Sequence, residues 1–67
     1  MLVYVSESTV KRIMKEAGAK RISSDASRYL QKRINSMLFD ISKKAVRLSK
    51  HARRKTVDVS DVKLACN

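Results

Sequence analysis

The chain has 67 residues and carries 16 Lys and Arg against 6 Asp and Glu, a formal net charge of +10 at pH 7. A chain this short forms at most one domain, expected over residues 1–67, and buries only about 60% of the surface that it exposes when unfolded. Small folds therefore need a disulfide, a metal or a partner chain. One cysteine excludes an intrachain disulfide, and one cysteine with one histidine is a poor zinc ligand set. We therefore expect no metal and no cofactor, and association with another chain is the source of stability that is left.

The positive charge predicts a polyanionic partner, which can be DNA, RNA or an anionic membrane surface. The apolar lead, residues 1–5, is too short for the core of a signal peptide, and no apolar run is long enough to span a membrane. A cytoplasmic location is expected. The absence of tryptophan disfavours a basic peptide that lies on a membrane surface. An enzyme acting on a small-molecule substrate is not expected, because no nucleophile–base pair is visible.

The first predicted helix follows Ser6, a suitable N-cap with Glu7 behind it in the first turn. Gly18, the only glycine, falls where this helix should end, in the left-handed conformation common after a helix. Residues 20–22 then form a tight joint to the next helix. This joint holds Arg21 beside a helix N-terminus, and an arginine with free backbone N–H groups can bind a phosphate. Apolar side chains recur through the first helix at Val10, Ile13, Met14 and Ala17.

The longest predicted element lies between residues 23 and 52, a stretch without proline or glycine. Its spacing predicts a helix of about 28 residues, roughly 42 Å long, capped by Ser23 or Ser24. Two short flanking helices cannot cover so long an apolar stripe, so much of it should meet a second chain. The stripe follows helical periodicity at Ala26, Leu30, Ile34, Met37, Ile41, Ala45, Leu48 and Ala52.

Positive charge is densest in residues 50–57, which form the second joint. Asp58 then predicts the N-cap of a third helix, with Asp61 three residues later as in a capping box. Cys66 is expected to be a small buried side chain rather than a reactive or metal-binding thiol. The predicted fold class is all-α, with a short, a long and a short helix.

Six segments match a known family in order, spacing and length. Together they resemble an archaeal histone, the tail-less form of the histone fold, and the last two are also similar to the end of a eukaryotic core histone. The resemblance covers the chain from about Val5 onwards and implies a handshake dimer of crossed long helices, formed with a second copy or with another histone chain. The segments are Arg12-Ile13-Met14-Lys15, Ala17-Gly18-Ala19, Arg21-Ile22-Ser23, Leu48-Ser49-Lys50-His51-Ala52, Arg54-Lys55-Thr56-Val57 and Asp61-Val62-Lys63-Leu64-Ala65.

The resemblance implies a chromosome-associated protein of the nucleoid that wraps and compacts double-stranded DNA into nucleosome-like particles. Arg12 is implied to enter the minor groove, with Arg21 close by. Such contacts read phosphates and groove width rather than base identity, so little sequence preference is expected. The implied DNA-binding residues are Arg12, Lys15, Arg21, Ser23, Arg54, Lys55 and Thr56.

Contacts beyond the dimer are implied in the same way. Leu48, His51 and Asp61 match the four-helix bundle that joins dimer to dimer, where His51 should hydrogen-bond Asp61 of the neighbouring dimer. Within one chain, Arg54 should form a structural ion pair with Asp61. Gly18 matches a position that lets successive turns of wrapped fibre approach closely.

The chain also departs from the family at several positions. Arg53 stands where a glycine is usual, and lysine stands at both Lys32 and Lys63, where the family commonly pairs a lysine with an acid. The second departure predicts weaker stacking between turns of the fibre. The alternative function is a histone-fold subunit of a transcription factor. That function would need an extension or insertion for a second partner, and none is visible.

Overall fold

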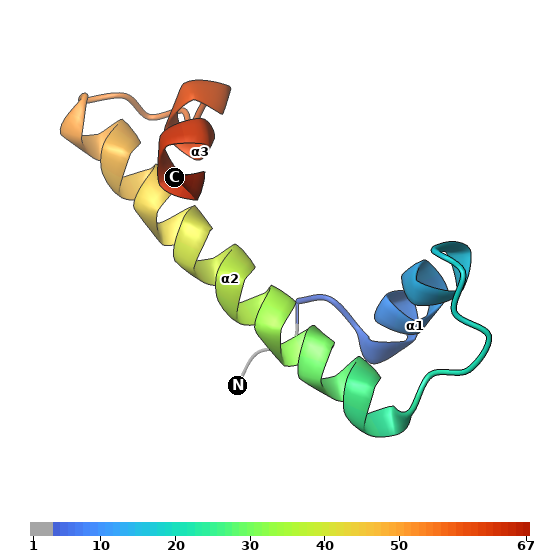
Figure 1. Cartoon of the computed structure of the whole chain (residues 1–67). Helices are drawn as coiled ribbons and strands as arrows, with labels where there is room; N and C mark the ends of the chain where they lie inside the picture. The colour runs from blue at the N-terminus through green and yellow to red at the C-terminus, as the bar shows by residue number, and fades with distance from the viewer. Residues whose placement is uncertain (1–3) are drawn as a thin grey trace. The chain divides into compact units, whose positions relative to one another are not determined.

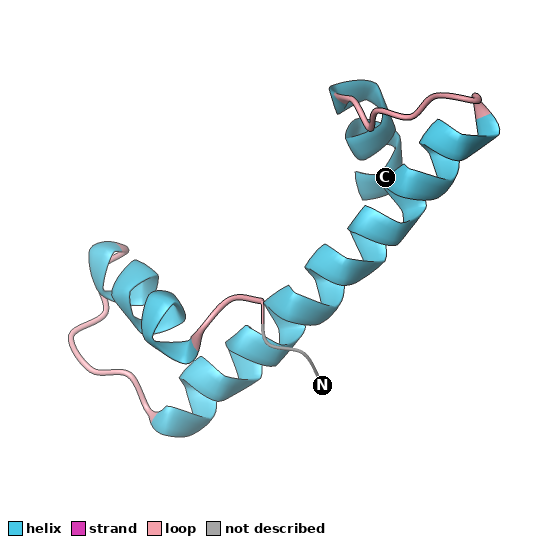
Figure 2. Cartoon of the chain, turned by 180° about the vertical axis from the view of Figure 1, so that it is seen from behind, coloured by secondary structure: helices cyan, strands magenta, loops and turns pink. Residues whose placement is uncertain are grey.

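A computed structural model describes residues 4–67, so the first three residues of the apolar lead lie outside the described residues. The chain forms three helices, α1 (Glu7–Glu16), α2 (Ser24–His51) and α3 (Val59–Cys66), which Figures 1 and 2 show as coiled ribbons. Residues 4–67 contain no strand. The predicted all-α class and the order short, long, short are confirmed.

The chain divides into two compact units. The first unit ends at Ser36 and contains α1 with the first half of α2; the second, Met37–Asn67, contains the rest of α2 and α3. The single domain expected over residues 1–67 stays a prediction. No helix in the described part of the chain is both long enough and apolar enough to cross a membrane.

The ends of α1 are set by local chemistry that is visible in the sequence. The Ser6 hydroxyl accepts a hydrogen bond from the Thr9 N–H at 3.2 Å, which satisfies one of the orphan donors of the first turn. At the other end, the Ala19 N–H donates to the Met14 carbonyl at 3.0 Å, the bond of a Schellman motif. Gly18 supplies the left-handed residue of this motif, with φ of +117°. A side chain there would meet nothing within 4 Å, so conformation, rather than space, requires the glycine.

The joint between α1 and α2 is longer than the sequence suggested. It comprises residues 17–23 rather than three residues, because the glycine turn and the capping serine both lie outside the helices. The Ser23 hydroxyl accepts from the Ala26 N–H at 3.1 Å, so Ser23 is the cap and Ser24 is the first helical residue.

A second Schellman motif ends α2, and its left-handed residue is an arginine. The Arg53 N–H donates to the Lys50 carbonyl and the Arg54 N–H donates to the Ser49 carbonyl, both at 2.9 Å. Arg53 has φ of +59°, the one positive φ at a non-glycine residue in residues 4–67. The chain therefore accepts local strain at this turn.

The capping box of α3 is present as predicted. The Asp58 carboxylate accepts from the N–H groups of Ser60 and Asp61, and the Asp61 carboxylate accepts from the Asp58 N–H at 3.0 Å. These reciprocal bonds fix both the start of α3 and the position of the Asp61 side chain.

A single chain leaves most of its apolar surface uncovered. Among the described residues, only Val10, Ala45 and Ala65 are buried apolar side chains. Of the predicted stripe on α2, only Ala45 is buried, and Met37 is 50% exposed. Cys66 is exposed, so the expectation of a buried cysteine is wrong for the chain by itself. Because hydrophobic burial is the main favourable term in folding, this surface needs a second chain to cover it.

Candidate nucleic-acid interface

A basic hollow lies at the joint between α1 and α2, inside the first unit. It has a volume of about 600 Å³, and no acidic side chain lines it. The N-terminus of α2 begins here, and its first N–H groups and the helix dipole favour an anion. The lining residues are Lys11, Lys15, Lys20, Arg21, Ile22 and Ser23.

The predicted DNA-binding residues of this half of the chain do not all occupy the hollow. Lys15, Arg21 and Ser23 line it, whereas Arg12 is exposed on α1 and does not. Ser23 also caps α2, so its hydroxyl oxygen is already engaged by a backbone N–H. Sequence reasoning missed Lys11 and Lys20 as members of the site, although their basic character within ten residues of Arg21 was a usable signal.

Polar side chains on α2 hold the segment that enters α1. The Asn35 amide pairs with the backbone of Val5 through both of its groups: Oδ1 accepts from the Val5 N–H at 2.7 Å, and Nδ2 donates to the Val5 carbonyl at 3.2 Å. Gln31 donates to the same carbonyl at 3.1 Å. Asn35 is only 4% exposed, so its amide is shielded from water. They fix the position from which α1, and hence one wall of the hollow, begins.

A third polar contact joins α1 to α2 directly. The Ser27 hydroxyl, which is fully buried, donates to the Glu7 carboxylate at 2.8 Å, and Glu7 also lies 3.8 Å from the Lys11 ammonium. Ser27, Gln31 and Asn35 follow one another at intervals of four residues along one line of α2. This polar line was not predicted, although its spacing of four residues is visible in the sequence.

At the second joint, the side chain of Arg54 is held by the start of α3. Its guanidinium forms a bidentate ion pair with the Asp61 carboxylate, in which Nη1 donates to Oδ2 at 2.8 Å and Nη2 donates to Oδ1 at 2.7 Å. Nη1 also donates to the Asp58 carboxylate at 3.1 Å and to the Thr56 carbonyl at 3.3 Å. The structure thus contains the ion pair that the resemblance implied, and the guanidinium links Thr56, Asp58 and Asp61.

The charges of this cluster shift one another's protonation. The hydrogen bond from Arg54 is the main reason that the pKa of Asp61 falls to about 2, and backbone N–H donation from Asp58 adds to it. The same contact with Asp61 raises the pKa of Arg54. The pKa of Asp58 is lowered chiefly by the hydrogen bond from Ser60. All three groups are therefore charged at neutral pH, so the ion pairs of the joint are present there.

Lys55 and Thr56 follow Arg54 on the exposed part of the joint. Their side chains are accessible to a ligand, whereas much of the guanidinium of Arg54 is already engaged. The bonds of Arg54 to Thr56, Asp58 and Asp61 lie within the chain, and its role in DNA binding stays a prediction.

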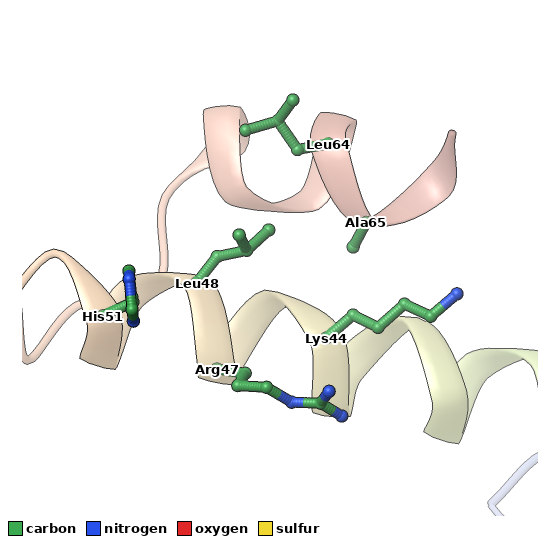
Figure 3. Close-up of a pocket in the computed structure, with 6 residues that line it drawn as sticks. All are labelled: Lys44, Arg47, Leu48, His51, Leu64 and Ala65. Carbon is green, nitrogen blue, oxygen red and sulfur yellow. The ribbon is translucent and has the colours of Figure 1, made fainter.

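An apolar groove lies between the end of α2 and α3, within the second unit (Figure 3). It has a volume of about 470 Å³, and Leu48 extends from α2 toward α3 inside it. Of the residues expected at the contact between dimers, Leu48 and His51 line this groove. Asp61 does not; it is 2% exposed and binds Arg54. The predicted bond between His51 and a neighbour's Asp61 stays a prediction, as does the role of Gly18 in fibre stacking.

Three helices in this order, with a basic hollow at one joint and an ordered arginine at the other, define a small basic all-α protein suited to a polyanion. A family model described as "Histone-like transcription factor (CBF/NF-Y) and archaeal histone" matches residues 5–66. The chain therefore belongs to this histone-fold family.

Individual relatives agree with this assignment. The chain is 48% identical over 54 residues to "Probable archaeal histone 3" of Methanocaldococcus jannaschii, with 81% of each chain covered. It is 39% identical over 56 residues to an archaeal histone of Thermococcus zilligii, with 84% of each chain covered. It is also 39% identical over 61 residues to "Histone H4, major" of Tetrahymena pyriformis, which covers 87% of this chain and 56% of that protein.

These findings confirm the resemblance on which the sequence analysis relied. The chain is a DNA-binding histone, and its family packages DNA rather than catalysing reactions. The relatives named above are all histones, so they do not favour the alternative function in a transcription factor over that of a histone.

Proposed function

We propose that this chain forms a handshake dimer, with a second copy or with another histone chain, that wraps duplex DNA along its two joints. The basic hollow at the first joint carries the proposal. Three lysines and Arg21 surround the N-terminus of α2 there, and no acid lies among the lining residues. Cations placed in this way displace condensed counterions from DNA, which gives affinity without sequence preference. Binding of this kind places the protein on the chromosome, in the nucleoid.

The dimer is supported by the apolar surface that one chain leaves uncovered. Eleven large apolar side chains of the described residues are exposed, from Val57 at 39% to Tyr29 at 75%. Exposed apolar area on this scale marks an interaction surface. Histone-fold dimerisation follows from the family, and crossing the two long helices would let each chain cover the stripe of the other.

The test is the salt dependence of binding to two duplexes of unrelated sequence. Arg21→Ala should weaken binding to both alike and flatten the plot of log affinity against log salt by about 0.9. Lys63→Ala is the matched control, because Lys63 is an exposed cation on α3 that lines neither the basic hollow nor the apolar groove. Its slope should stay close to that of the wild type. Arg54 is less suitable for this test, since its loss would also disorder the second joint.

Two results would contradict the proposal. Equal slopes for Arg21→Ala and the wild type would remove the hollow from the DNA-binding surface. A loss of affinity confined to one of the two duplexes would favour the transcription-factor alternative. Wrapping itself is read by nuclease digestion of saturated DNA, where protected fragments should increase in regular steps.

A further inference from the structure

The groove between α2 and α3 combines an apolar floor with a basic rim. Leu64 is 62% exposed at one side, and Leu48 and Ala65 complete the apolar part. Lys44, Arg47 and His51 form the remainder of the lining, and no acidic side chain contributes to it. Figure 3 shows the side chains of Lys44 and Arg47 extending from different sides of α2, with α3 drawn above this helix.

The positive charge of this rim is not compensated by the chain itself. Neither Lys44 nor Arg47 forms an ion pair with any of residues 4–67. Asp61, the nearby acid at the start of α3, does not pair with Lys44 or Arg47. Its carboxylate accepts hydrogen bonds from both Nη atoms of Arg54 and from the Asp58 N–H. With 3% of its side chain exposed, Asp61 offers almost no surface to an incoming partner.

A contact between two copies of this groove would bring like charges together. Closed contacts between identical copies are isologous, so the same patch lies on both sides of the interface. Two copies would place two Lys44 and two Arg47 side chains in one small interface. Juxtaposed like charges are a recognised device for rejecting a wrong partner, because desolvation strengthens their repulsion.

We propose that the groove docks a histone dimer of different sequence, one that presents an apolar side chain flanked by Asp or Glu, and that it rejects a second copy of this chain when DNA is absent. The inference rests on the proposed function, since it takes the groove to be the contact between dimers. An apolar anchor would fill the space between Leu48 and Leu64. Acids beside that anchor would pair with Lys44 and Arg47. The partner is thus selected by charge complementarity as well as by shape.

The experiment uses a charge-swapped copy of the chain, Lys44→Glu with Arg47→Glu, as the acidic probe. Wild type alone and the swapped variant alone should each sediment as dimers at low salt, because each has a groove of one sign. An equal mixture should form tetramers and longer assemblies, because each dimer carries two grooves, with about tenfold tighter association than either protein alone. If chains exchange between the two kinds of dimer, the resulting mixed dimers carry one groove of each sign. These mixed dimers also dock with one another, so chain exchange does not remove the tighter association. Added salt should weaken these mixed assemblies, because it screens the attraction between the grooves.

The control is Lys43→Glu with Lys50→Glu, which changes the same charge on the same half of α2 at positions outside the groove. Mixing this variant with the wild type should leave both as dimers. A second variant, Lys44→Gln with Arg47→Gln, covers the case in which the swapped chain fails to fold. Relieved of repulsion, it should associate with itself at least about tenfold more tightly than the wild type.

Three outcomes would overturn the inference: tetramers of wild type alone at low salt, a mixture that remains dimeric, or a neutral variant that associates no better than wild type. Failure of the proposed function is separately visible. It would appear as wild-type protein that does not bind DNA, whatever its state of association in free solution.

Discussion

Arg53 is the position where we expect a substitution to stabilise the protein. Its φ of +59° places a side chain with a Cβ in the left-handed conformation at the end of α2. That conformation costs an ordinary L-residue about 1–2 kcal/mol. A glycine avoids this cost but loses more conformational entropy on folding, which destabilises the fold by about 0.5–1 kcal/mol. Arg53→Gly should therefore stabilise each chain by roughly 0.5–1 kcal/mol. At about 4–8 °C per kcal/mol for a domain of this size, Tm should rise by several degrees.

The measurement is thermal unfolding followed by far-ultraviolet circular dichroism at one fixed protein concentration, because the Tm of an associating protein depends on concentration. Arg53→Ala is the necessary comparison. It removes the same charge and side chain but keeps a Cβ in the left-handed conformation, so its Tm should lie below that of Arg53→Gly. Equal Tm values for the two variants would refute the reasoning, since relief of charge repulsion would then explain any gain over the wild type.

Three further predictions follow from the structure. Sedimentation in moderate salt should give twice the chain mass of 7.6 kDa, and Tm should rise with concentration; a folded monomer whose stability ignores concentration would contradict this. Because Arg54 lowers the pKa of Asp61 from 3.8 to about 2, the pair stabilises the fold fully above about pH 4 and loses that contribution as the pH falls towards 2. Asp61→Asn should therefore show a lower Tm at neutral pH and a smaller further decrease over that acid interval. Asn35→Ala should cost about 1–3 kcal/mol in denaturant unfolding, because it removes two hydrogen-bond partners of the part-buried Val5 backbone. Ser36→Ala, at an exposed position, should stay within about 0.5 kcal/mol of the wild type.

The helix ends were predictable because their signals are local. Ser6, Gly18 and Asp58 act on groups only a few residues away, so the sequence alone places the cap, the glycine turn and the capping box. The apolar repeat of α2 predicted a long helix for the same reason. The joint after α1 was predicted too short, because the turn and the cap that flank it were counted with the helices.

Contacts between distant parts of the chain were not predictable in this way. Asn35 lies 30 residues from Val5, and nothing near either residue indicates that one binds the backbone of the other. Cys66 was expected to be buried from the general habits of cysteine, which depend on a core that one chain does not build. The ion pair of Arg54 came from the family resemblance; the structure adds the contacts with Asp58 and Thr56 that hold the guanidinium within the joint.

Apolar surface and charge oppose each other in the assembly of this histone. The uncovered stripe of α2 favours association, yet each chain contributes +10, so a dimer of identical chains carries +20. Self-repulsion of that size destabilises a compact state, and salt reduces it only beyond about 10 Å at 0.1 M. DNA supplies the opposite charge where the lysines and arginines of the joints gather. A ligand that binds the folded dimer better than the unfolded chain raises the stability of the fold. DNA should therefore stabilise the dimer that binds it, and the same charge that weakens the free protein gives the complex its affinity.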